Sequence, residues 1–119
     1  MGLDMYLNEH PAKNQEESLI ELHYWRKHNA LHSWFEEKYR ELNPMFDGDF
    51  NLVDFYLTED LLLELKGAIE AGTLTPREGF FFGPTDYDPT EYRDDDLRAV
   101  NQALERVRAG KVISYTAWW

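Results

Sequence analysis

Two histidines four residues apart, His28 and His32, stand inside an aromatic stretch that runs from residue 24 to residue 35. On a helix this spacing would put both imidazoles on one face. There they could bind one metal ion, hydrogen-bond at the edge of a core, or line a polar pocket or partner surface. The helical zinc signature has a Glu directly after its first His, but Asn29 holds that position here, and the chain has no cysteine. We therefore expect neither a bound metal nor a cofactor.

A second segment, residues 79–88, combines three consecutive phenylalanines with flanking glycines and acidic residues. Successive residues of an extended chain point to opposite faces, so the three rings need cover on both sides. The segment could be a buried strand capped by turns, or a loop whose rings wall a pocket with polar groups at its mouth. We expect it to pack beside the 24–35 stretch, because both carry more apolar surface than a small sheet can cover.

No complete catalytic constellation accompanies these segments. The chain has no Gly-rich phosphate loop ending in Lys-Ser/Thr and no Gly-x-Ser-x-Gly elbow. The run Asp94-Asp95-Asp96 is adequately explained by the dipole at the start of a predicted helix. The sequence therefore leans against an enzyme, and it indicates no catalytic residue.

The surrounding elements predict a single α+β domain over residues 1–119. Alternating or β-prone runs predict strands over 2–7, 50–57 and 111–119. Apolar periodicity predicts helices over 16–42, 59–71 and 90–109. Thr58 is the expected N-cap of the middle helix, and Gly72 is its expected end. This order favours a small sheet of about three short strands, covered on one face by three helices.

Each predicted helix carries an apolar stripe that should face the core. In the first helix the stripe is Ile20, Tyr24, Leu31, Phe35 and Leu42. The adjoining face of that helix holds Trp25, His28, His32 and Tyr39. The stripes of the other two helices are Leu61, Leu65, Ala68 and Ile69, and Leu97, Val100, Leu104 and Val107.

Composition excludes several classes of protein. Of the 119 residues, 43% are hydrophobic and 15% aromatic, which argues against disorder despite a net charge of −11. No apolar run is long enough to span a membrane, and the start of the chain lacks the basic region of a signal peptide. The 12 cations are scattered among 23 acids, so direct nucleic-acid binding is not expected. The absence of cysteine fits a reducing cytoplasm, and the acidic charge could serve solubility, meet a basic partner or imitate nucleic acid.

Several pieces of the chain, in order, resemble one family. They are the opening MGLDMYL, the stretch Tyr24-Trp25-Arg26-Lys27 with Asn29, His32 and Trp34-Phe35, the run Phe80-Phe81-Phe82-Gly83 with Thr85-Asp86-Tyr87-Asp88, and the closing Tyr115 and Trp118. They are similar to an uncharacterised family of small proteins from bacteriophages and prophage-bearing bacteria, and they span nearly the whole chain. The resemblance implies a phage-related protein of the bacterial cytoplasm and no particular activity. Relatives usually have a small residue at the position of His28 and a longer stretch between the first strand and the first helix.

The family pieces coincide with the two unusual segments and predict one binding locus. Its residues are Trp25, Arg26, Asn29, His32, Trp34, Phe82, Asp86 and Tyr87. The leading hypothesis is a non-enzymatic accessory protein that binds a host or phage protein, an inhibitor of a host system being one such role. The alternative is a small-ligand-binding protein or minor enzyme, with a pocket between the first helix and the Phe-Gly segment.

The closing pair Trp118-Trp119 needs burial of at least one ring, because each indole carries a large apolar area. In an extended strand the two rings face opposite ways. We therefore expect one indole to dock on the domain. The other could cover a second copy of the chain, which makes a homodimer one of the possible states.

Overall fold

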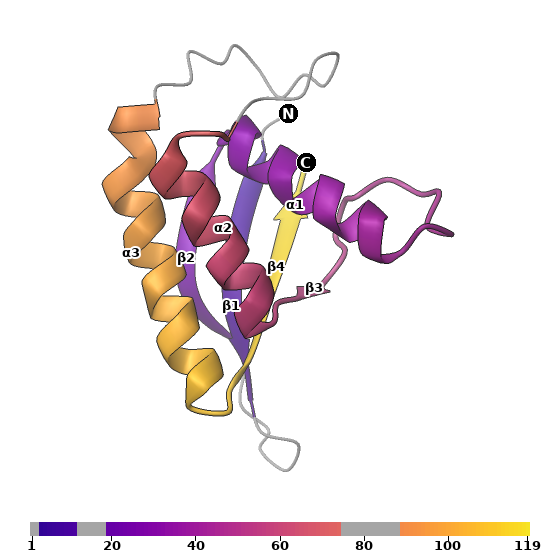
Figure 1. Ribbon diagram of the computed structural model, residues 1–119. Helices are drawn as coiled ribbons and strands as arrows, with labels where there is room; N and C mark the ends of the chain where they lie inside the picture. Colours follow the sequence, from indigo (N-terminus) through magenta and orange to yellow (C-terminus); the bar gives the residue numbers. More distant parts are fainter. Residues whose placement is uncertain (1–2, 12–18, 75–88) are drawn as a thin grey trace.

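The computed structural model describes residues 3–11, 19–74 and 89–119. Its elements are β1 (Asp4–His10), β2 (Ile20–Arg26), α1 (Asn29–Leu42), β3 (Phe55–Tyr56), α2 (Glu59–Ala71), α3 (Pro89–Arg108) and β4 (Val112–Trp118). The four strands form one antiparallel sheet in the order β2-β1-β4-β3, and the helices lie on one face of it (Figure 1). The predicted α+β class is confirmed, with four strands in the described chain in place of about three.

Strand β2 is the main correction to the expected elements. The sequence predicts one helix over 16–42, but residues 20–26 pair with β1 as a strand, and α1 begins only at Asn29. Between them Lys27 adopts a left-handed backbone with φ of 56°, and its N–H donates to the carbonyl of Leu3 at 2.8 Å. Pairing with a distant strand thus overrides a local pattern that also fits a helix.

Strand β1 lies inside the sheet and sorts its side chains to two sides. It reaches His10, beyond the strand expected over 2–7. Met5 and Leu7 are fully buried beneath the helices, whereas Asp4 and Tyr6 are half-buried on the other side. This alternation follows directly from the period of two in a strand.

A β-bulge interrupts the pairing of β1 with β2. Leu7 lies opposite His23, but the next residue, Asn8, lies opposite Glu21. Leu22 is therefore an extra residue on β2, and such an insertion bends the strand and increases its twist.

The predicted core stripe of the first helix is only partly right. Leu31 and Phe35 are buried in α1, and the Phe35 ring stacks on Tyr115 of β4 with centroids 3.9 Å apart. Ile20 and Tyr24 belong to β2 and are exposed, and Leu42 is exposed at the end of α1.

The remaining elements follow local signals closely. Helix α2 has the predicted bounds, with the Thr58 hydroxyl accepting from the Leu61 N–H and Gly72 in the left-handed region at φ of 68°. Helix α3 ends one residue before the predicted limit, and β4 lies inside the predicted strand. The strand expected over 50–57 shortens to the two residues of β3, although Phe50 is buried.

The apolar stripes of α2 and α3 face the core as expected. Fully buried members are Leu65, Ile69, Val100 and Leu104. Partly buried members are Leu61, Ala68, Leu97 and Val107.

The two closing tryptophans differ in burial, as the sequence predicts. Trp119 packs partly buried against the core, with its ring edge-on to His32 at 5.1 Å, and its backbone N–H donates to the side-chain oxygen of Asn51. The Trp118 side chain is 56% exposed. The expectation that one indole docks on the domain is confirmed.

We predict that Trp119→Ala lowers the free energy of unfolding by roughly 1–3 kcal/mol, because it removes a partly buried indole from the core. The melting temperature should fall by several degrees. Trp118→Ala is the matched control, and its melting temperature should change by no more than about a degree, since an exposed ring contributes little. Equal shifts for the two variants in thermal unfolding would contradict this assignment.

Candidate functional site

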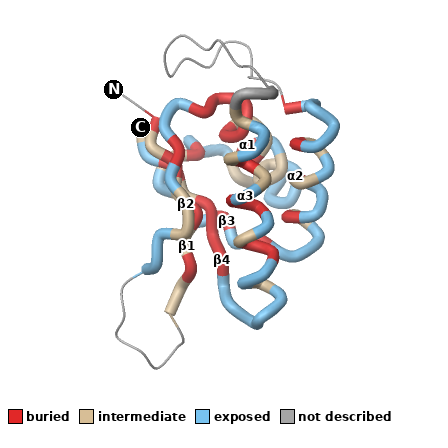
Figure 2. Tube along the Cα trace, turned by 90° about the vertical axis from the view of Figure 1, so that its left-hand side faces the viewer, coloured by how far each residue is buried: buried red, intermediate tan, exposed pale blue. Residues whose placement is uncertain are grey.

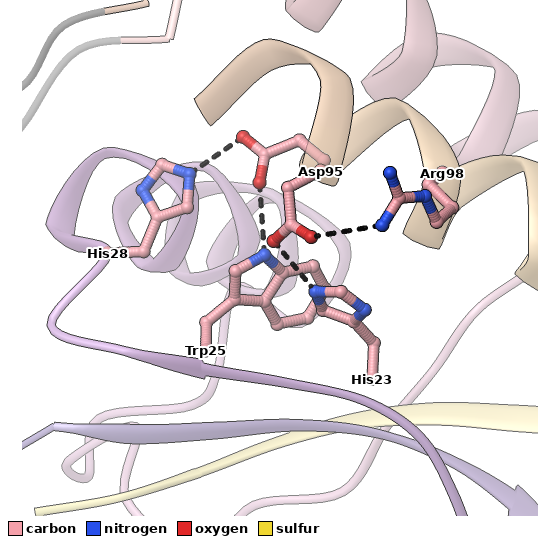
Figure 3. A network of polar contacts seen from close by, with 6 residues as sticks. His23, Trp25, His28, Asp95 and Arg98 are labelled. Carbon is pink, nitrogen blue, oxygen red and sulfur yellow. Dashed lines mark hydrogen bonds and ion pairs between the residues drawn. The ribbon is translucent and has the colours of Figure 1, made fainter. Parts of the chain in front are cut away.

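A buried carboxylate, that of Asp96 in α3, joins three elements of the fold. It accepts a hydrogen bond from the indole N–H of Trp25 in β2 at 3.0 Å, and another from Nε2 of His28 at 2.7 Å (Figure 3). His28 is the residue at the N-cap of α1, so a single side chain holds a strand, a helix start and a second helix together. His28 and Asp96 are each only 1% exposed.

Aromatic and polar neighbours extend this network. The ring of Tyr92 stacks on His28, with centroids 4.6 Å apart. At the rim, His23 and Asp95 form a hydrogen bond of 3.0 Å, and Arg98 lies 4.0 Å from the same carboxylate (Figure 3). Asp95 and Asp96 thus contact different partners, one half-exposed and one buried, and Asp96 has a role beyond the helix dipole that the sequence suggested.

His32 forms a second buried pair on the same helix. Its Nδ1 lies 2.6 Å from the hydroxyl oxygen of Tyr115, within hydrogen-bonding distance. Burial lowers the pKa of His32 to about 4, so the imidazole is neutral at pH 7. Burial, followed by the nearby charge of Glu36, raises the pKa of Tyr115 well above its usual value. Both groups are therefore uncharged at neutral pH, and their hydrogen bond lies within the core.

These histidine contacts support the fold more directly than they support chemistry on a ligand. A general base must reach the proton that it removes, and the imidazoles of His28 and His32 are each 1% exposed. In the part of the chain that the structure describes, no group of three or more His, Asp or Glu side chains is placed to hold a metal ion. The expectation that the protein binds no metal ion stays a prediction.

The other side of the sheet carries a different kind of surface, which we call the open face. Figure 2 shows the sheet with the helices packed on one side of it. The open face consists of the strand residues that alternate with those facing the helices. They are Asp4, Tyr6, Asn8 and His10 of β1, Glu21, Tyr24 and Arg26 of β2, Tyr56 of β3, and Val112, Ser114, Thr116 and Trp118 of β4. Among the described residues, no helix covers this face.

Large aromatic side chains dominate the open face. Tyr24 is 43% exposed, Tyr56 55% and Trp118 56%. The rings of Tyr6 and Tyr24 lie tilted with centroids 5.3 Å apart, and the ring of His10 lies 5.2 Å from Tyr56. The face therefore presents two aromatic groups to solvent, one at each end.

Polar contacts fix parts of the open face. The Tyr24 hydroxyl donates to the Asp4 carboxylate at 2.5 Å, and the Thr116 hydroxyl donates to Asp54 at 2.6 Å. His10 and the buried Ser114 hydroxyl lie 2.7 Å apart. These bonds hold side chains in place that would otherwise sample several rotamers.

The structure separates the predicted locus residues that it describes. Trp25, Asn29 and His32 are buried on the helix side of the sheet, whereas Arg26 is exposed on the open face. Arg26 follows Trp25 in a strand, and successive strand residues face opposite ways. Trp34 is half-buried on α1. Trp25 thus belongs to the buried Asp96 network and His32 to the pair with Tyr115, and Arg26 faces away from both.

The rest of that locus, Phe82, Asp86 and Tyr87, lies outside the described residues, as does all of segment 79–88. The expected packing of this segment beside the 24–35 stretch stays a prediction. The small-ligand pocket of the alternative hypothesis stays a prediction for the same reason.

Sequence reasoning missed Asp96 and most of the open face. The signal for Asp4 and Tyr6 was present, because alternation in the first strand separates them from Met5 and Leu7. The signal for Tyr24 is hidden, because residues 20–26 also fit a helical pattern.

Comparisons with protein-family models, with curated proteins and with solved structures found no match to this chain. Within the described residues, no helix is both long and apolar enough to span a membrane.

We predict that Asp96→Asn lowers the free energy of unfolding by roughly 2–4 kcal/mol. The amide would turn an N–H toward one of two buried donors and would remove the buried charge that accepts from both. Asp95→Asn makes the same chemical change at a half-exposed site and should cost under about 1 kcal/mol. Urea unfolding of both variants measures the difference, and equal losses would show that Asp96 is not the anchor.

We predict that His32 makes the fold less stable in acid. Its folded pKa of about 4 lies below its ordinary value of 6.5, so the unfolded chain binds more protons between these pH values. Stability should therefore fall as pH drops through this window, by up to about 3 kcal/mol from this residue. Carboxylates titrate in the same range, so the comparison is with His32→Gln, whose stability in urea should change less steeply with pH. Parallel curves for the two proteins would show that His32 does not carry this effect.

Proposed function

We propose that this chain is a non-enzymatic protein-binding protein whose contact surface is the open face. The single observation that carries this proposal is the exposure of Tyr24, Tyr56 and Trp118 on one side of the sheet. Tyrosine and tryptophan are enriched in protein interfaces, where they supply large contact areas at low cost in conformational entropy. A side-chain set of this kind on a sheet held by the core suits a preformed docking surface.

Charge favours a basic protein as the partner. The chain has a net charge of −11, and the open face carries the acids Asp4 and Glu21 together with Arg26, while Asp54 hydrogen-bonds Thr116 of that face. Such a surface repels the phosphate backbones of nucleic acids and attracts the positively charged surfaces of basic proteins. Complementary charge also speeds encounter and disfavours wrong partners.

The resemblance to small phage and prophage proteins supports a partner within the bacterial cytoplasm, belonging to the host or to the phage. An inhibitor of a host system fits this setting, since an acidic surface can cover a basic groove. The buried histidine pairs then serve the domain that presents the open face.

A photo-crosslinking experiment in a bacterial host tests this proposal. A benzophenone amino acid is placed at Tyr56 on the open face or, as a matched control, at Leu63, which is 43% exposed on α2. We expect a discrete crosslinked protein of basic composition from position 56 and none from position 63. Adding Tyr24→Ser and Trp118→Ser should abolish that crosslink while leaving the melting temperature nearly unchanged.

Equal crosslinking from both positions would contradict the proposal, as would a product that persists when both aromatic residues are replaced. A crosslink to a second copy of the chain would show that the surface serves self-association.

A further inference from the structure

The open face contains one group of side chains with a more specific character. Asp4 and Tyr6 of β1 lie beside Tyr24 of β2, whose hydroxyl donates to the Asp4 carboxylate at 2.5 Å. On the other side of β1, Asp4 lies directly opposite Trp118 of β4. Directly opposed residues in an antiparallel pair have Cβ atoms about 4.5–5.5 Å apart, so the indole starts beside the carboxylate. We call these four residues the Asp4 cluster.

No described cation forms an ion pair with the carboxylate of this cluster. Among the described residues, Asp4 has no Lys, Arg or His nitrogen within the 4.0 Å of an ion pair, and its hydrogen-bond donor is the neutral Tyr24 hydroxyl. Arg26 lies directly opposite Asp4 in the register, as Trp118 does on the other side, so its charge is close by, but its guanidinium forms no ion pair with Asp4. A carboxylate can accept several charge-assisted hydrogen bonds, so Asp4 retains the capacity to pair with a cation from outside.

The pKa values of the two tyrosines are shifted by the same carboxylates. The pKa of Tyr24 is raised, first by its hydrogen bond to Asp4, although the charge of Arg26 acts in the opposite direction. The pKa of Tyr6 is raised by partial burial and then by the charges of Asp4 and Glu21. Neighbouring carboxylates therefore make formation of a further negative charge unfavourable here, and the same field favours a positive charge.

The aromatic rings add a second attraction for the same kind of group. The faces of tyrosine and tryptophan rings attract ammonium and guanidinium ions through the ring quadrupole. Tyr6 and Tyr24 place two such rings beside the carboxylate, and Trp118 lies opposite Asp4 in the register, whereas the other aromatic group, His10 with Tyr56, has the Ser114 hydroxyl as its polar neighbour. The two ends of the open face thus differ in the ligand that they suit.

We propose that the Asp4 cluster binds a lysine or arginine side chain of the protein partner, with the cation held by the Asp4 carboxylate and by the rings of Tyr6, Tyr24 and Trp118. This inference rests on the proposed function, since it specifies the anchor residue of the same partner. Arginine suits the cluster through stacking and lysine through a compact charge.

The test uses the full chain and a peptide of alternating lysine and glycine at low ionic strength. Binding is followed by the chemical shifts of backbone amides and of the Trp118 indole N–H in two-dimensional NMR. We expect shifts at Tyr6, Tyr24 and Trp118, and no binding of the same peptide with acetylated lysines. Acetylation removes the charge and keeps most of the side chain, so it separates cation recognition from apolar contact.

Two isosteric variants isolate the carboxylate. Asp4→Asn removes the charge and keeps an oxygen that accepts from Tyr24, and it should weaken peptide binding roughly fivefold or more. Asp54→Asn removes the same charge from a carboxylate hydrogen-bonded to Thr116, and it should weaken binding less than about twofold. Circular dichroism and the dispersion of the NMR spectrum verify that both variants fold.

Equal weakening by the two variants would overturn the inference, because the peptide would then follow diffuse charge. Shifts centred on Tyr56, or equal binding of the acetylated peptide, would overturn it as well. The crosslinked partner separates the two proposals. Retention of that crosslink in Asp4→Asn, with loss on replacing Tyr24 and Trp118, would leave the proposed function standing and refute the cation site. Retention in every open-face variant would refute the proposed function itself.

Discussion

Strand β1 pairs with β2 along one edge and with β4 along the other, and these two ladders determine where almost every important side chain lies. With the register fixed, Met5 and Leu7 must face the helices, and Asp4 and Tyr6 must face away from them. A shift of one residue would exchange the two sets, placing a carboxylate in the core and a methionine in water. The buried residues of β1 therefore hold the open face in position.

Polar groups on the two faces of the sheet differ in their access to water. On the helix side the Asp96 carboxylate is almost completely excluded from water, and such a group is tolerable only when hydrogen bonds satisfy it, as Trp25 and His28 do. On the open face Asp4 keeps contact with solvent and needs no such compensation. Similar residue types thus stabilise the fold on one side and are available for recognition on the other.

The parts of the fold that sequence predicted are those that depend on nearby residues. Thr58 and Gly72 bound α2 through contacts within a single turn, so its limits follow from local chemistry. Strand β2 depends on pairing with β1 across an intervening segment, and its Ile20 and Tyr24, four residues apart, also fit a helical stripe. Asp96 lies 71 residues from Trp25 in the chain, and no local pattern links the two. The candidate surface was missed mainly because it is built across strands.

The bulge at Leu22 has a consequence for how this acidic domain behaves at high concentration. The free edge of a sheet is a template on which another chain can add a strand and begin a fibril. Here one edge of the described sheet is the bulged strand β2, where added twist spoils a long straight match. The opposite edge is β3, which has two residues and offers almost no ladder. Both edges are poor seeds for amyloid growth, so the domain can expose aromatic rings on a sheet without polymerising through its strands.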